Sequence, residues 1–384
     1  MAGSERIAGR ATAEGTKRFA ERFAALPGHF RRPDRLWLSS LGLGTKPGAP
    51  GGVDDLCYRS AVPRALELGA NVFDTSISYR QQTSERALGR ALSRAFREGV
   101  AARDEVFVVS KCGYLSPDAE SVMDGRRYLL RTYVESGLVD LADVTNGVHV
   151  LTPRFVADQV ARSRENLGLD TIDLYMLEDP ELLLAARGPS DFKKELAALF
   201  ETLEAAVAGG AIASYGLSTW HGLLVPYGER GHLSMFELLE TAIDVGGPEH
   251  HLRGVALPYS VALGEAKGLA SQFGPEARPA NLFETLRDTG TAVLTAARHA
   301  AVLPPGVPGP GERCAALSAV RAQHSRSHDG AGVDAQPGAR RREPRARRAR
   351  ARACRSDRQA VRDGAQTRGA RVIGSAHGPH VRAG

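Results

Sequence analysis

Short apolar runs alternate with amphipathic helical patterns between residues 38 and 297. The apolar runs predict seven strands, at residues 38–45, 71–75, 105–111, 173–178, 213–219, 254–260 and 291–297. The helical patterns predict six helices, at residues 53–68, 84–97, 155–167, 190–208, 233–245 and 281–289. Repeated strand and helix units predict an α/β fold with a parallel sheet. Two arrangements fit: a doubly wound open sheet, or a barrel of eight units with one unit unaccounted for.

Two features favour the barrel. No GxGxxG motif follows the first predicted strand, as it does in a dinucleotide-binding open sheet. Polar residues recur at the carboxyl ends of successive predicted strands, namely Thr45, Asp74, Lys111, Glu178, Ser218 with Thr219, and Ser260. Barrel enzymes build their sites at that end, so we expect a TIM-type (β/α)8 barrel that is incomplete at the eighth unit.

One connection is much longer than the fold requires. About 40 residues separate Lys111 from Thr152, whereas a few residues suffice for such a connection. Connections of this length are usually lids, binding loops or disordered segments. This one leaves from the predicted site.

Charge divides the chain into unlike parts. The net charge is +6, yet residues 301–384 alone hold 17 Arg, six acidic residues, no Lys and no aromatic residue, a balance of +11. A segment of this composition buries little apolar surface, so we expect a disordered basic tail at 301–384. Clustered Arg also suits phosphates of nucleic acid, but base-stacking aromatics are missing and we expect no specific nucleic-acid partner.

The cysteines and the apolar runs indicate the cellular environment in which we expect the protein. Four cysteines are too few and too scattered for a disulfide framework or a CxxC metal site, so we expect a reducing environment and no bound metal. No apolar run is long enough to span a membrane, and the first 15 residues lack the apolar core of a secretory signal. We therefore expect a cytoplasmic protein. The oligomeric state is left open.

Three residues near the ends of the second and third predicted strands suggest chemistry. Asp74 ends one strand, Tyr79 lies in the loop that follows, and Lys111 ends the next strand. A tyrosine acts as a general acid when a cation assists release of its proton, and a carboxylate can hold that cation in place. Taken singly, Asp74 can also be a turn cap, Tyr79 a loop aromatic and Lys111 a solvated strand end.

The spacing of several motifs resembles the aldo-keto reductase superfamily. The resemblance rests on "LGLGT", "GANVFDTSISYRQQTSERALG", "VFVVSK", "SRENLGLDTIDLYML" and "YGLSTW", which cover roughly residues 36–300 in the family's order. It implies a (β/α)8 barrel that binds NADP(H) and reduces a small carbonyl substrate. Tyr79 is then the general acid, Lys111 its activator and Asp74 the anchor. The implied cofactor-binding residues are Gly44, Thr45, Asp74, Ser218 and Thr219.

Residue 178 departs from the family pattern. The family has a histidine there, whereas this chain has Glu178 at the end of "IDLYMLE". An ionised carboxylate repels the charge that develops on a substrate oxygen, so Glu178 helps only when it is protonated. The steroid double-bond reductases of the superfamily resemble this case, which suggests reduction of an activated C=C bond. The neighbouring Asp179 and Glu181 are expected to be solvated.

The C-terminal part departs further. The resemblance implies an eighth strand and a phosphate-binding loop after residue 298, where this chain has Pro, Gly and Arg-rich sequence. We hypothesise that this segment is an out-of-frame translation. The expected organisation is an N-terminal extension at 1–35, a reductase barrel at 36–300 and a basic tail at 301–384. The alternative is a barrel-derived binding protein without catalytic activity, or a non-functional product.

Overall fold

A computed structural model describes residues 6–260, 263–273 and 278–296. The eighth strand, the disordered tail and the out-of-frame segment expected from the sequence lie outside these residues. No helix in the described part of the chain is long and apolar enough to cross a membrane.

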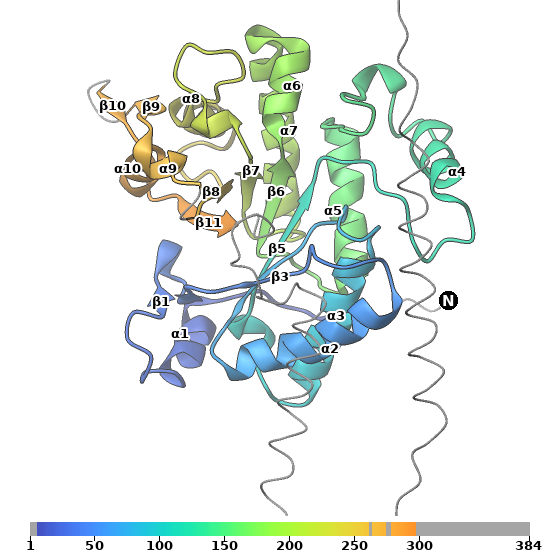
Figure 1. Ribbon diagram of the computed structural model, residues 1–384, viewed down its shortest axis with the longest axis vertical. Helices are drawn as coiled ribbons and strands as arrows, with labels where there is room; N and C mark the ends of the chain where they lie inside the picture. The colour runs from blue at the N-terminus through green and yellow to red at the C-terminus, as the bar shows by residue number, and fades with distance from the viewer. Residues whose placement is uncertain (1–5, 261–262, 274–277, 297–384) are drawn as a thin grey trace, which may run out of the picture. The chain divides into compact units, whose positions relative to one another are not determined.

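The described residues form a seven-stranded parallel sheet (Figure 1). Its strands are β3 (Leu43–Gly44), β4 (Val72–Asp74), β5 (Phe107–Cys112), β6 (Leu174–Glu178), β7 (Tyr215–Ser218), β8 (Leu252–Pro258) and β11 (Ala292–Ala296). Each strand pairs with the next one in this order, without a reversal. A doubly wound sheet reverses its strand order at a switch point, so that arrangement is excluded. Seven consecutive units of a curled barrel sheet are present, as the sequence predicted.

Helices follow the strands and pack on one another around the sheet. The helices between sheet strands are α2 (Gly52–Glu67), α3 (Thr83–Arg97), α5 (Pro153–Leu167), α7 (Pro189–Ala208), α8 (Met235–Gly246) and α10 (Leu282–Asp288). Consecutive helices from α2 to α8 contact their neighbours. Helix α5 is capped at both ends: the Thr152 hydroxyl caps the first turn, Pro153 occupies the first helical position and Gly168 ends the helix in the left-handed region.

Alternate residues of the strands face two different cores. One face of the sheet packs against the helices through a large cluster that includes Phe73, Val108 and Tyr175. The other face contributes Val72, Phe107, Val109, Leu174, Met176 and Ala256 to a smaller inner cluster. Since successive side chains of a strand point to opposite faces, residues 74, 111 and 178 continue the inner face. This alternation places three candidate residues above the inner core.

The first predicted strand is divided in the structure. β2 (Leu38–Ser39) pairs antiparallel with β1 (Phe30–Arg31), and only β3 joins the main sheet. Helix α1 (Ala13–Glu21) precedes this hairpin and buries Phe19 in the main core. The prediction of one continuous strand over 38–45 is therefore wrong, because residues 40–42 change direction between the two pairings.

The N-terminal segment is anchored beneath the inner core. Asp173, just before β6, accepts hydrogen bonds from the backbone N–H of Ala11 at 2.6 Å and of Val108 at 2.8 Å. It also forms a buried ion pair with Arg103, whose Nη2 lies 2.8 Å from Asp173 Oδ2. These contacts tie the segment before α1 to β5 and β6 at the end of the sheet opposite the candidate residues.

The long connection between β5 and α5 has its own structure. It contains α4 (Gly125–Leu129), a π-helical turn η3 (Leu130–Val134) and a 3-10 turn η4 (Leu141–Asp143). Tyr128, Tyr133 and Phe155 pack together in a separate hydrophobic cluster, which joins this connection to α5. Disorder, one of the three alternatives for this segment, is therefore wrong.

Short elements complete the described chain. They are η1 (Pro33–Arg35), η2 (Arg103–Glu105), α6 (Pro180–Arg187), η5 (Gly222–Leu224), α9 (Glu265–Gly268), β9 (Gln272–Phe273) and β10 (Pro279–Ala280). Helix α6 begins directly after Asp179, whose backbone lies in the left-handed region at φ 47°. This turn at residue 179 ends β6 and fixes the direction in which the chain leaves the sheet.

Candidate active site

The register of the parallel sheet brings the candidate residues to one end. Gly44 is paired with Asp74 across β3 and β4, and Glu178 is paired with Ser218 across β6 and β7. Lys111 lies in β5, next to its last residue. All of these positions are at the carboxyl ends of their strands, where parallel α/β folds place their sites.

Lys111 is held in one orientation. Its ammonium lies 2.7 Å from Asp74 Oδ1, donates to the carbonyl oxygen of Thr75 at 2.7 Å and donates to the Tyr79 hydroxyl oxygen at 3.2 Å. An ammonium has three N–H donors, so these three contacts use all of them. The side chain is only 3% exposed, and burial by itself lowers its pKa. The negative charge of Asp74 acts against burial and raises the pKa of Lys111, which keeps it protonated.

Tyr79 has a hydroxyl that is free to donate. The Lys111 ammonium can only donate, so the phenol oxygen accepts that bond and its own proton points elsewhere. Burial raises the pKa of Tyr79, while the positive charge of Lys111 acts to lower it. Tyr79 therefore carries its proton at neutral pH, and Lys111 is placed to stabilise the phenolate when the proton leaves.

Glu178 is buried beside this pair. The carboxyl oxygen Oε2 accepts from Ser76 Oγ at 2.7 Å, and Ser76 also lies 3.2 Å from the carbonyl oxygen of Lys111. Burial raises the pKa of Glu178, against the opposing effects of Lys111 and Ser76. Its other oxygen, Oε1, makes no hydrogen bond with a residue that the structure describes. A protonated Glu178 therefore has a free O–H donor at the site.

The long connection supports the backbone of Glu178. His149 is fully buried, and its Nε2 lies 2.9 Å from the carbonyl oxygen of Glu178. Burial lowers the pKa of His149, so the ring is neutral and donates this bond from Nε2. Gly113 allows the backbone of β5 to pass close to Glu178. Its φ is +154°, and a Cβ added at this position would lie 2.8 Å from the same carbonyl oxygen. His149 and Gly113 were not predicted, because they become neighbours of Glu178 only through the fold.

The proposed cofactor residues differ in how open they are. Gly44 is exposed and a Cβ added to it meets no atom within 4 Å, and Ser218 is partly exposed at the end of β7. Thr45, in contrast, is buried and donates its hydroxyl to Thr75 Oγ1 at 2.8 Å. Thr219 donates its hydroxyl to Glu181 Oε1 at 2.7 Å. Gly44 and Ser218 therefore leave room for a ligand, whereas the hydroxyls of Thr45 and Thr219 are already used.

Glu181 is not solvated as expected. Its Oε1 also accepts from the backbone N–H groups of Trp220, His221 and Gly222, at 3.2–3.3 Å. Its Oε2 is buried without a hydrogen-bond partner among the described residues. A row of backbone N–H groups is a common anion-binding arrangement, and here the chain supplies its own carboxylate. Asp179 is not free either, since it accepts a hydrogen bond from the Tyr114 hydroxyl.

Lys46 is a second cation at the site that the sequence analysis missed. It follows Thr45 directly, and its Nζ lies 5.3 Å from the centroid of the Tyr79 ring. The Lys111 ammonium lies 4.7 Å from the same centroid. The sequence offered a signal for Lys46, because it directly follows Gly44 and Thr45 at the end of a predicted strand.

Other chemistry receives little support from the described residues. Cys112 is fully buried, and burial raises the pKa of its thiol, so it is an inert core side chain and not an activated nucleophile. No group of three or more His, Cys, Asp or Glu within the described ranges is arranged to hold a metal ion.

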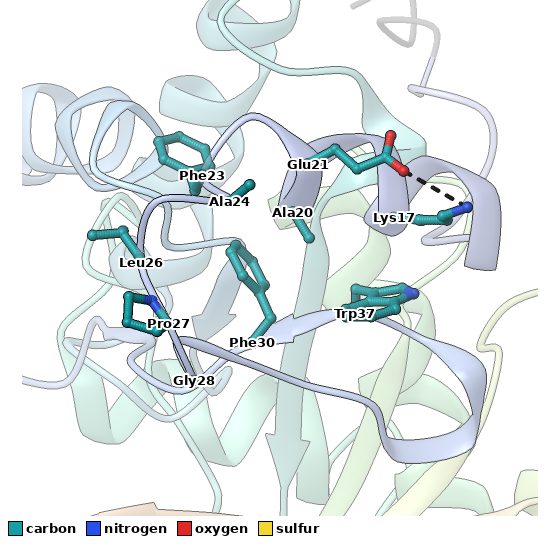
Figure 2. Close-up of a pocket in the computed structure, with 10 residues that line it drawn as sticks. All are labelled: Lys17, Ala20, Glu21, Phe23, Ala24, Leu26, Pro27, Gly28, Phe30 and Trp37. Carbon is teal, nitrogen blue, oxygen red and sulfur yellow. Dashed lines mark ion pairs between the residues drawn. The ribbon is translucent and has the colours of Figure 1, made fainter.

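A hydrophobic cavity of about 290 Å³ lies between α1 and the β1–β2 hairpin (Figure 2). Phe23, Phe30 and Trp37 line it, and Lys17 pairs with Glu21 at 3.6 Å along its side. Helix α1 packs against η2, which precedes the start of β5, whereas Lys111 lies near the other end of that strand. The cavity is therefore separate from the candidate active site.

The fold and the candidate active site define a parallel α/β barrel protein with its site at the carboxyl ends of the strands. Residues 40–223 match the family model described as Aldo/keto reductase family. The matched segment contains all four candidate catalytic residues, Asp74, Tyr79, Lys111 and Glu178. The resemblance to aldo-keto reductases that the sequence motifs indicated is confirmed by this match.

Several named proteins are similar over part of their length. Aldo-keto reductase family 4 member C11 of Arabidopsis thaliana is 27% identical over 199 residues, which cover 50% of this chain and 49% of that protein. The NADH-specific methylglyoxal reductase of Escherichia coli is 31% identical over 148 residues, 37% of this chain and 38% of that protein. Deoxymugineic acid synthase 1 of Hordeum vulgare is 36% identical over 100 residues, 26% of this chain and 31% of that protein. The matches thus span about half or less of these relatives.

Solved structures of aldo-keto reductases are also similar to this chain, at low sequence identity. The holo form of an enzyme from Bacillus halodurans is 19% identical, with a TM-score of 0.43 and coverage of 76% of both chains. An enzyme from Klebsiella pneumoniae in complex with NADP and acetate is 17% identical, with a TM-score of 0.42 and coverage of 70% of this chain and 68% of that one.

Proposed function

We propose that this protein catalyses NADPH-dependent reduction of a small carbonyl compound or of an activated C=C bond, with Tyr79 as the proton donor. The observation that carries the proposal is the arrangement of Lys111, whose three donors are fixed on Asp74, Thr75 and Tyr79. A buried lysine in this arrangement serves one purpose well, which is to stabilise negative charge on the Tyr79 oxygen.

The residues around the site fit the nicotinamide end of a cofactor. Gly44 and Ser218 leave open space at the strand ends, and Asp74 lies between Gly44 and Lys111 in the sheet. When bound there, NADPH supplies the hydride. Residues 36–300 would form the catalytic unit, and residues 1–35 an extension that supports it.

Proton delivery is the part that this chain's own residues perform. Tyr79 donates its proton to the substrate oxygen as negative charge develops there, and Lys111 stabilises the phenolate that remains. Asp74 keeps Lys111 charged and oriented. The reaction needs no strongly acidic tyrosine, because the developing alkoxide or enolate is a strong enough base to take the proton.

Glu178 decides which substrates are favoured. When protonated, it donates a second hydrogen bond to the substrate oxygen from Oε1. Two donors on one oxygen polarise an enone strongly, which favours reduction of the C=C bond conjugated to it. Burial of Glu178 supports the protonated form.

A binding protein without chemistry is the second candidate, and a specific observation favours it. Glu181 fills the row of backbone N–H groups at residues 220–222, and the Thr219 hydroxyl is bound to the same oxygen. In this conformation neither is available to a cofactor.

Titration with NADPH tests the proposed function, with Trp220 as a fluorescent reporter next to Ser218 and Thr219. Saturable quenching, together with NADPH consumption in the presence of phenylglyoxal or cyclohexenone, is the expected result. Quenching without consumption of either substrate supports the binding protein, and absence of both rejects NADPH-dependent reduction.

A further inference from the structure

Lys46 differs from Lys111 in that its donors are not used. Its side chain is exposed, and it forms no hydrogen bond or ion pair with any residue in the described part of the chain. Its contact there is with the face of the Tyr79 ring, 5.3 Å from the centroid. An ammonium over an aromatic ring is attracted weakly at an exposed site, so Lys46 keeps its full capacity to bind an anion.

The neighbouring carboxylates have other partners. Lys46 lies close enough to Glu178 and Asp179 to act against the rise in their pKa values, for which burial is the main cause. Glu178, however, is bonded to Ser76, and Asp179 accepts the Tyr114 hydroxyl. Lys46 therefore adds positive charge to the site without being neutralised by a direct ion pair there.

We propose that Lys46 binds an anionic group of the substrate, and that the substrate class is α-keto acids. This inference rests on the proposed function. The hydroxyl that protonates the substrate oxygen belongs to the ring over which Lys46 lies, so the substrate carbonyl would bind next to a ring whose centroid is 5.3 Å from the ammonium. A carboxylate attached directly to the carbonyl carbon fits this short separation.

Two other roles for Lys46 make different predictions. If Lys46 assists Tyr79 directly, its loss slows reduction of charged and neutral substrates alike. If it binds a phosphate of the cofactor, its loss weakens NADPH binding. Binding of a substrate carboxylate affects only the charged substrate, because a charge-assisted hydrogen bond is lost only there.

The experiment compares phenylglyoxylate with its neutral methyl ester, which has the same reacting carbonyl. For Lys46→Met, the ratio of kcat/KM for the acid to that for the ester falls about 10-fold or more, whereas Lys46→Arg retains most of it. The Kd for NADPH, from fluorescence titration, stays within about 2-fold for both variants. An equal loss for acid and ester, an unchanged ratio, or a change confined to NADPH binding overturns the inference.

A calorimetric titration separates this inference from the proposed function. If the unaltered protein turns over neither compound, the proposed reduction fails, but binding of phenylglyoxylate can still be measured. The inference then predicts a Kd for phenylglyoxylate that is about 10-fold higher in Lys46→Met than in the unaltered protein. Equal Kd values, or no binding to either protein, reject it.

Discussion

The Lys111 ammonium donates a hydrogen bond to the hydroxyl oxygen of Tyr79 across 3.2 Å. Since this bond uses the phenol oxygen as an acceptor, the Tyr79 proton is left for another partner. Asp74 and the carbonyl oxygen of Thr75 hold the ammonium from the other side. The relationship makes Lys111 an electrostatic partner of Tyr79 that never gives up its own proton.

Replacement of Lys111 tests this relationship. Lys111→Met removes the charge that stabilises the Tyr79 phenolate, and we expect kcat for phenylglyoxal reduction to fall about 100-fold or more. Asp74→Asn keeps the ammonium in place with a weaker partner and should cause a smaller loss. Steady-state kinetics measure both effects. A Lys111→Met variant with more than about a third of the original kcat would contradict the role given to Lys111.

The pH dependence of activity tests the protonation of Glu178. Burial raises the pKa of Glu178, and only its protonated form donates to the substrate oxygen. Activity on an enone should therefore decline as the pH rises through this pKa. Glu178→Gln provides a donor that does not titrate, so this decline should disappear from its kcat/KM profile. Identical profiles for the two proteins would show that Glu178 does not act through its proton.

Stability provides a second and independent readout of Glu178. An acid whose pKa is raised in the folded state binds more protons when folded, so its contribution to stability is present below about pH 4.3 and is lost as the pH rises through the folded-state pKa. The free energy of unfolding of Glu178→Gln should therefore rise relative to that of the original protein as the pH increases above about 4.3. Urea denaturation at several pH values measures the difference. A constant difference would contradict the raised pKa.

Asp173 should matter for folding and not for chemistry. Its buried carboxylate pairs with Arg103 and accepts two backbone N–H groups. Asp173→Asn leaves the Arg103 charge uncompensated, and we expect a loss of about 3 to 5 kcal/mol in the free energy of unfolding. Glu98→Gln, which breaks the exposed ion pair with Arg94, is the matched control and should cost about 0.5 kcal/mol or less. Equal losses in chemical denaturation would contradict this account of the anchor.

Local patterns in the sequence were enough to predict most of the sheet and its helices. The strand predicted at 173–178 contains β6, and the helix predicted at 155–167 lies within α5. The division of 38–45 was missed because the apolar run itself does not show that Leu38 and Ser39 pair antiparallel with Phe30 and Arg31, which precede them in the chain. Helix α6 was missed because Pro180 indicates a turn and also suits the first residue of a helix.

The sequence indicated candidate site residues only where a family motif includes the end of a predicted strand. Asp74 and Glu178 end their strands and Lys111 is next to the end of its own, all on one face, so the alternation of the strands places them together. His149 reaches Glu178 from the long connection, through pairing of residues 114 and 149 that no local pattern indicates. Glu181 was expected in solvent because it follows a proline turn, yet the start of α6 directs it to the backbone of residues 220–222.

Deuterium transfer tests the central claim most directly. NADPH that carries deuterium at its transferable position is incubated with phenylglyoxal or cyclohexenone and the protein, and the product is examined by mass spectrometry. The account predicts a deuterated alcohol or ketone with the original protein, and at least about a 100-fold lower rate of its formation with Tyr79→Phe, whose NADPH affinity is unchanged. Equal rates of deuterium transfer by the two proteins would contradict the claim that Tyr79 donates the proton.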